Sequence, residues 1–310
     1  MAFTFSKATR KNVPLLISLA GVSGSGKTYS ALLLAAGLAG DRPVAFLDTE
    51  NGRGSMYADS PGIMAALPNG YDVGDMQEPF SPGRFSEAVD DAARAGCAVL
   101  VIDSFTHEWE GFGGCSDIAE NNKLRGMPNW AKAKLEHKRM MNHLLAAPMH
   151  IIFCLRAREK VKVVKADNGK EQVVPIGLQA IQEKNFIFEM TLSLLLDEVT
   201  HVPEVTKCPE PLLPLFAGQQ SRITKDMGRK LLAWAESGAT AVTTEDGLFE
   251  QAKLYAGEGL TAYSDYWNGL SATQKKVLLP KHEENKKLAI NHDQAALDES
   301  RRAEEQLLQP

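Results

Sequence analysis

The chain has 310 residues, of which 44% are hydrophobic and 24% are charged, and its formal net charge is −5. This length can bury a large core and leaves room for a second, smaller domain. The slightly acidic balance excludes a general attraction to nucleic acid, so that any such contact must be local.

The cysteines and the apolar runs indicate the class of protein. The four cysteines form no Cys-x-x-Cys pair, which predicts reduced, buried thiols without a metal or redox role. No apolar run approaches the roughly 20 residues that cross a bilayer, and the N-terminus lacks a signal-peptide pattern. We therefore expect a cytoplasmic protein with no membrane contact.

Residues 21–28 read Gly-Val-Ser-Gly-Ser-Gly-Lys-Thr, a complete G-x-x-x-x-G-K-[ST] phosphate loop. An apolar run at residues 15–20 predicts a strand before it, and residues 28–36 predict a helix after it. In this context Lys27 supplies charge near the β and γ phosphates, and the Thr28 hydroxyl can bind Mg²⁺. The expected nucleotide-binding residues are Gly21, Ser23, Gly24, Ser25, Gly26, Lys27, Thr28 and Tyr29.

Two further predicted strands end in carboxylates. Residues 44–47 lead into Asp48-Thr49-Glu50, and the apolar run at residues 97–102 ends at Asp103. Because ligands of open parallel sheets gather at the carboxyl ends of strands, these acids should face the phosphate loop. We expect Asp103 to bind Mg²⁺ together with Thr28, and Glu50 to be the general base, while Asp48 holds the turn.

The rest of the chain predicts more helices and strands. Residues 106–127 are rich in glycine and are expected to form a mobile loop. Apolar runs predict strands at residues 149–155 and 186–196, and residues 299–310 are expected to be frayed. Helical spacing predicts helices at residues 85–93, 129–145, 223–234, 244–256, 260–270 and 271–280.

A cationic β-hairpin is expected between these elements. Residues 161–165 and 170–174 flank Asn168-Gly169, a dipeptide that supplies the positive φ of tight hairpin turns. The cations suit either contact with a nucleic-acid backbone or simple solvation. The candidates for DNA contact are Arg158, Lys160, Lys162, Lys165 and Lys170.

The order of these motifs resembles the RecA-like recombinase ATPases, especially the compact AAA-type ATP-binding recombination proteins of bacteriophages. The resemblance covers about residues 14–235 and is specific at three segments, residues 21–28, 45–50 and 99–104. It implies a RecA-like P-loop fold with a mostly parallel central sheet, a β-hairpin extension and a small C-terminal helical module.

The resemblance also implies roles for individual residues. Glu50 corresponds to the catalytic glutamate and Asp103 to the Walker B aspartate. Arg156 stands where these recombinases have a glutamine that senses the γ-phosphate, and we count it with Lys27 and Glu50 as catalytic. The hairpin takes the place of the DNA-binding loop, and Lys207 is the candidate for contacting ATP bound to a neighbouring subunit.

These observations predict an ATPase domain at residues 1–240 and a helical module at residues 241–310. The expected function is Mg²⁺-dependent ATP hydrolysis coupled to single-stranded DNA, in a filament or ring that serves phage recombination or replication in a bacterial host. The alternatives are a translocating motor of the helicase or packaging kind, or a nucleotide-gated adaptor that recruits protein partners with little hydrolysis.

Overall fold

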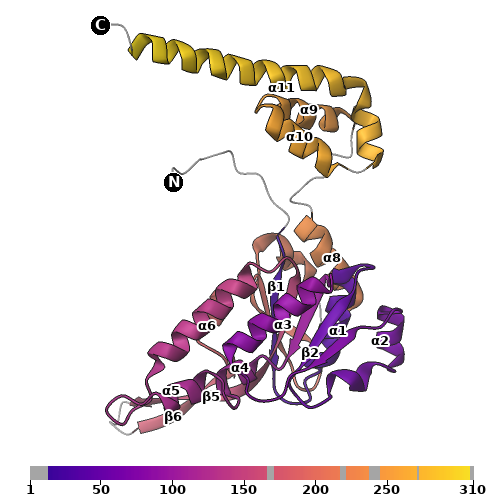
Figure 1. Ribbon diagram of the computed structural model, residues 1–310. Helices are drawn as coiled ribbons and strands as arrows, with labels where there is room; N and C mark the ends of the chain where they lie inside the picture. Colours follow the sequence, from indigo (N-terminus) through magenta and orange to yellow (C-terminus); the bar gives the residue numbers. More distant parts are fainter. Residues whose placement is uncertain (1–12, 166–170, 217–220, 237–244, 271, 308–310) are drawn as a thin grey trace. The chain divides into compact units, whose positions relative to one another are not determined.

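The computed structural model describes residues 13–165, 171–216, 221–236, 245–270 and 272–307 (Figure 1). Contacts divide this described part into two units, one within residues 12–236 and the other within residues 237–310. Among the described residues, no helix combines the length and the apolar character that a bilayer crossing needs.

The first unit is built on a mixed, mostly parallel sheet, as predicted. Its strands follow the order β3-β2-β4-β5-β1-β7-β8, and only β8 runs antiparallel to its neighbour in this path. The carboxyl ends of β1, β2, β4 and β5 therefore share one edge of the sheet. The bounds are Leu16–Gly21 (β1), Val44–Asp48 (β2), Asp72–Asp75 (β3), Val99–Asp103 (β4), His150–Lys165 (β5), Leu192–Leu196 (β7) and Pro203–Lys207 (β8).

Helices cover both faces of this sheet. One core lies between the sheet and α1 (Lys27–Ala39), α2 (Pro61–Ala66) and α8 (Lys225–Glu236). The other core lies between the sheet and α3 (Pro82–Arg94) and α6 (Trp130–Leu145), which are side by side in Figure 1. Strands buried on both faces need continuous apolar runs, which explains why β1 and β4 were evident from the sequence.

The predicted hairpin is present, but it is not a separate ribbon. Its first strand is the outer half of β5, and β6 (Glu171–Ala180) pairs antiparallel with it, with a register shift between Lys160 and Val161. The inner half of β5 pairs with β1 and β4 as far as Arg156. The predicted turn at Asn168-Gly169 and Lys170 lie outside the described residues.

Two expectations for loops and strands were wrong. Residues 106–127, expected to be a loop, contain α4 (Thr106–Glu110) and α5 (Cys115–Asn121). Residues 186–196 are not one strand, since α7 (Phe186–Glu189) precedes β7. Neither β3 nor β8, whose last residue is Lys207, was predicted. Two 3₁₀ segments, Gly54–Tyr57 and Glu210–Leu215, complete this unit.

The second unit is helical, with α9 (Glu245–Ala256), α10 (Leu260–Gly269) and α11 (Ala272–Leu307). Its core contains Tyr263, which is 1% exposed, together with apolar residues from all three helices. The predicted end of the last helix at Pro280 was wrong. Pro280 is exposed and removes only one backbone donor, while Ala289 beyond it packs into the core, so α11 continues to Leu307 and includes most of the segment expected to be frayed.

Candidate nucleotide-binding site

The phosphate loop between β1 and α1 has the backbone that its glycines allow. Gly24 and Gly26 have φ angles of 85° and 82°, a region that other residues rarely adopt. No side chain caps the N-terminus of α1, so the amide groups of its first turn remain directed at the space above the loop. Ser25 is fully buried beneath the loop, and its Oγ has no partner among the described atoms. This arrangement fits an anion such as a phosphate group.

Lys27 and Thr28 begin α1 at this loop. The Nζ of Lys27 donates to the carbonyl oxygens of Gly21 (3.1 Å) and Val22 (2.8 Å). An ammonium carries three donors, so these bonds leave one for a ligand. The Oγ1 of Thr28 donates to Oδ2 of Asp103 across 2.6 Å, which joins the loop to the carboxyl end of β4 as the sequence predicted.

Asp103 is 4% exposed, and its environment suits a cation. Burial raises the pKa of its carboxyl group to about 6, and the carboxylates of Glu50 and Asp48 add to the effect, while Thr28 and Lys27 oppose it. A divalent cation beside Asp103 would offset the cost of keeping this carboxylate charged inside the protein. The paired hydroxyl and carboxylate are oxygen ligands of the kind that Mg²⁺ prefers.

The two acids at the end of β2 have different tasks. Asp48 is buried and holds the turn, because its Oδ1 accepts from the amide of Glu50 and its Oδ2 from the amide of Gly54, both at 2.6 Å. The side chain of Glu50 is 10% exposed and lies between two guanidinium groups. Arg156 donates to Oε1 through Nε (2.9 Å) and Nη2 (2.6 Å), and Arg53 donates to Oε2 (2.7 Å).

These contacts decide the charge of Glu50. Burial tends to raise its pKa, but the hydrogen bonds and charge of Arg156, followed by the charge of Arg53, outweigh burial and hold the pKa below its usual value. Glu50 is therefore ionised at neutral pH, as a general base must be. In this structure the two arginines neutralise it.

Hydrogen bonds of Thr49 also join the carboxyl end of β2 to that of β4, next to Glu50 and Asp103. The Oγ1 of Thr49 donates to the carbonyl of Ser104 (3.0 Å), accepts from its amide (2.8 Å) and lies 2.7 Å from Nδ1 of His107. Burial and the nearby Arg156 lower the pKa of His107, so its ring is neutral at pH 7. The link holds the ends of the two strands, and with them Glu50 and Asp103, in fixed register.

One cavity of about 700 Å³ brings most of the predicted residues together, a size that suits a nucleotide. Gly21, Ser25 and Tyr29 do not line it, and Tyr29 instead contacts the ring of Tyr57 at 5.9 Å. The predicted residues that line it are Ser23, Gly24, Gly26, Lys27, Thr28, Glu50, Asp103 and Arg156, and Arg53, Met56, Tyr57, Ala157 and Ile181 complete the wall.

Comparison with known proteins agrees with this geometry. A family model described as "AAA domain" matches residues 14–208, which is more than half of the chain. The chain belongs to the AAA domain family. No curated protein matches it. Membership indicates a nucleotide-binding ATPase domain of the P-loop class, in agreement with the phosphate loop and the mostly parallel sheet.

Other predicted residues lie outside the cavity of this AAA domain. Arg158, Lys160 and Lys162 are exposed on β5, and Arg158 pairs with Oε1 of Glu110 at 3.1 Å. The side chain of Lys165 and the whole of Lys170 are outside the described part. Lys207 donates to the carbonyl oxygens of Ile187 (3.0 Å) and Phe188 (2.7 Å), and so is bound within its own chain.

The sequence analysis missed two residues of the AAA domain site. Arg53 follows β2 by five residues, and its place in Asn51-Gly52-Arg53-Gly54, just after the acidic strand end, was the available signal. His201 lies in the turn between β7 and β8, where its ring is within van der Waals distance of a Cβ built on Gly26. Nothing local in the sequence connects His201 with the phosphate loop, because only the pairing of β1 with β7 brings them together.

Proposed function

We propose that this protein is a Mg²⁺-dependent ATPase whose hydrolysis is coupled to single-stranded DNA. The observation that carries the proposal is the contact of Thr28 with Asp103 at 2.6 Å on the cavity that Lys27, Glu50 and Arg156 also line. The resemblance to phage recombination ATPases supports a setting in DNA recombination or replication.

The residues of the cavity divide the work of binding. The loop amides and Lys27 bind the phosphates, while Thr28 and Asp103 are the residues that would hold Mg²⁺. When bound, Mg²⁺ neutralises charge on the phosphate oxygens during transfer. Because Asp103 is buried and joined to Thr28, both oxygen ligands are positioned before the ion arrives.

Arg156 and Arg53 control how far the carboxylate of Glu50 is available to water. They donate three hydrogen bonds to the oxygens of Glu50, which leaves this carboxylate fewer lone pairs with which to activate water. Both guanidinium groups line the cavity and are about half exposed, so they can move their hydrogen bonds to phosphate oxygens. Glu50 then has more lone pairs free to accept a proton from water.

The continuity of β5 supports the proposed coupling to DNA. Side chains alternate along a strand, so Arg156, Arg158, Lys160 and Lys162 lie on one face, from the cavity outward. Phosphate-backbone contact by these cations would connect DNA with the arginine that faces the nucleotide. On the opposite face Val161, Val163 and Val173 are each more than half exposed, which supports burial against another subunit in a filament or ring.

The proposal is tested by ATP turnover with and without single-stranded DNA. We expect DNA to raise kcat in the wild type, and Glu50→Gln to lower kcat by about 10² to 10⁴-fold while ATP still binds. Binding should even tighten, because the substitution removes the negative partner of both arginines. Unchanged turnover in Glu50→Gln would exclude Glu50 as the base, and turnover indifferent to DNA would remove the coupling.

The neutralised state of Glu50 also favours a second candidate, the nucleotide-gated adaptor. An adaptor needs bound ATP to persist, and two arginines on the general base would slow hydrolysis. Single-turnover kinetics separate the two functions, because an adaptor would keep its slow rate at saturating single-stranded DNA.

A further inference from the structure

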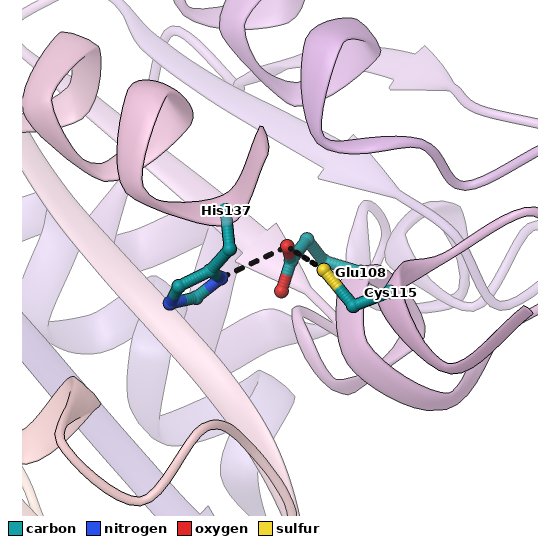
Figure 2. Close-up of side chains that lie close together, drawn as sticks. All are labelled: Glu108, Cys115 and His137. Atoms are coloured by element: carbon teal, nitrogen blue, oxygen red, sulfur yellow. Dashed lines mark hydrogen bonds and ion pairs between the residues drawn. The ribbon is translucent and has the colours of Figure 1, made fainter. Parts of the chain in front are cut away.

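A buried cluster outside the nucleotide cavity combines three different ligand chemistries. Glu108 from α4, Cys115 at the start of α5 and His137 from α6 converge behind the sheet edge (Figure 2). They are 0%, 0% and 7% exposed. None of the three lines the nucleotide cavity, and no part of the proposed ATPase chemistry uses them.

The three side chains point at one position. The thiol of Cys115 donates to Oε1 of Glu108 across 3.1 Å, and Nδ1 of His137 lies 3.0 Å from the same oxygen. Figure 2 shows the thiol and the imidazole on either side of this oxygen. One atom from each residue fits within 4.8 Å of the other two.

The carboxylate of Glu108 is incompletely satisfied. Its Oε2 is buried and has no hydrogen-bond partner among the described atoms, although an ionised carboxylate accepts at both oxygens. Leaving a buried charged oxygen without a partner is costly. The buried Oε2 of Glu108 is therefore an acceptor that a bound cation would satisfy.

We propose that Glu108, Cys115 and His137 bind a divalent transition-metal ion of the zinc class. Thiolate, imidazole and carboxylate are the ligands that Zn²⁺ takes in proteins, and three protein ligands leave one tetrahedral position for a water molecule. Tetrahedral bonds at zinc distances place ligand atoms about 3.4 to 3.6 Å apart. The observed 3.0 and 3.1 Å separations would open by a few tenths of an ångström, and the thiol and the imidazole, which lie within 4.8 Å of each other, would adjust to the same spacing.

The charges balance when the ion binds. The Cys115 thiol loses its proton to solvent, and the resulting thiolate and the Glu108 carboxylate together match the two positive charges. A coordinating thiol is deprotonated outright by a bound metal ion.

The position of the cluster indicates a structural role. Its ligands come from α4, α5 and α6, so one ion would join three helices that otherwise meet through a small apolar core. Glu108 follows His107, which contacts Thr49 at the nucleotide cavity. His137 also lines a separate cavity of about 300 Å³.

Cobalt substitution tests the proposal on the full chain without an affinity tag. After removal of bound metal, Co²⁺ should bind the wild type at about one ion per chain and produce a thiolate-to-cobalt absorption band in the near ultraviolet. Cys115→Ala should abolish this band. Two controls should keep it: Cys208→Ala, at a half-buried thiol, and Cys154→Ala, whose thiol lies beside Asp103 in the nucleotide site.

Thermal unfolding of the wild type tests the proposal without the need for a variant that folds. A chelator should lower the melting temperature of the wild type, and Zn²⁺ should restore it. Two results together would overturn the proposal. The folded wild type would give no charge-transfer band with millimolar Co²⁺, and its melting temperature would change with neither chelator nor Zn²⁺. A band that survives Cys115→Ala but disappears in Cys154→Ala would also overturn it.

Discussion

Glu50 combines an ionised carboxylate with two guanidinium partners inside one cavity. A general base must be charged, and its low pKa meets this need, but the arginines responsible for the low pKa also occupy its oxygens. Glu50 can act as a base only if the two arginines donate their hydrogen bonds to other acceptors when the substrate binds. In the proposed mechanism, hydrolysis therefore depends on whether Arg156 donates to Glu50 or to the substrate.

Replacing Arg156 with methionine tests this dependence. Since Arg156 lowers the pKa of Glu50, we expect the acid limb of the kcat/KM profile to move to higher pH in Arg156→Met. KM should rise as well, because methionine cannot donate a hydrogen bond to a phosphate oxygen. The measurement is the pH profile of steady-state hydrolysis, with Arg94→Met on the surface of α3 as the control. An unmoved acid limb would show that Arg156 does not control Glu50.

His150 predicts a pH dependence of stability. Its Nδ1 accepts from the amide of Leu15 at 2.9 Å, and burial lowers its pKa from 6.5 to about 4. The unfolded chain therefore binds more protons between these values, and the free energy of unfolding decreases as pH falls through this window, by at most about 3 kcal/mol.

The substitution His150→Asn keeps an acceptor but removes the titration. We expect the difference in unfolding free energy between pH 7.5 and pH 5 to shrink by up to about 2 kcal/mol, because only the part of the window above pH 5 is sampled. Urea unfolding at several pH values measures it, and an identical pH slope in both proteins would contradict the assignment.

At the scale of elements, α1 and α8 approach each other through two glycines. A Cβ on Gly37 would lie 2.1 Å from the carbonyl oxygen of Lys225, and a Cβ on Gly228 would lie 2.4 Å from that of Leu34. The backbones are therefore packed against each other without intervening side chains. This contact places α8 over the helix that carries the phosphate loop.

We expect Gly37→Ala to destabilise the protein by about 1 to 3 kcal/mol, because one helix must shift to admit the methyl group. The control is Gly83→Ala in α3, where a Cβ meets nothing within 4 Å, and where better helix propensity gives up to about 1 kcal/mol of stabilisation. Denaturant unfolding separates the two. Equal effects would mean that the helices tolerate the added atom.

The cations of β5 make a prediction about DNA. We expect Lys160→Gln combined with Lys162→Gln to weaken binding of single-stranded DNA and to lower the slope of log K against log salt by about 1.4, because each lysine that pairs with a phosphate adds about 0.7 to this slope. Basal hydrolysis should not change. The matched control pairs Lys132→Gln with Lys138→Gln on α6, and an equal weakening in both would indicate non-specific attraction.

The sequence predicted correctly those elements whose residues all lie in one kind of environment. β4 is buried along its whole length, so its apolar run is unmistakable, and the phosphate loop needs its glycines for backbone reasons alone. β3 is exposed along its length and carries two aspartates, so no pattern marks it. Residues 106–127 look like a loop because of their glycines, yet a Cβ on Gly114 would lie 2.6 Å from the carbonyl of Glu108, which shows that close packing requires them.

The site was predictable only where chemistry follows a local motif. Lys27, Thr28 and Asp103 follow from motif positions, whereas Arg53 depends on how the turn after β2 folds back. The cluster at Glu108, Cys115 and His137 fits no ligand spacing, because its members come from three helices. Tertiary packing brings the three residues together, and no short sequence pattern indicates this convergence.

For the whole molecule, the division into two units predicts two unfolding transitions. The helical unit has a small core, with few fully buried side chains around Tyr263, so it should melt at lower temperature. A chain that ends at Glu236 should lose this transition in calorimetry and keep its nucleotide binding. Loss of nucleotide binding on truncation would show that residues 237–310 support the ATPase unit.

The length of β5 has a mechanical consequence. One unbroken strand of 16 residues starts between β1 and β4, passes the nucleotide cavity at Arg156 and continues as half of the hairpin. The stretch from Arg156 to Lys165 spans about 30 Å, at a rise of about 3.3 Å per residue. A tilt of about 10° at the cavity would thus carry the far end through about 5 Å.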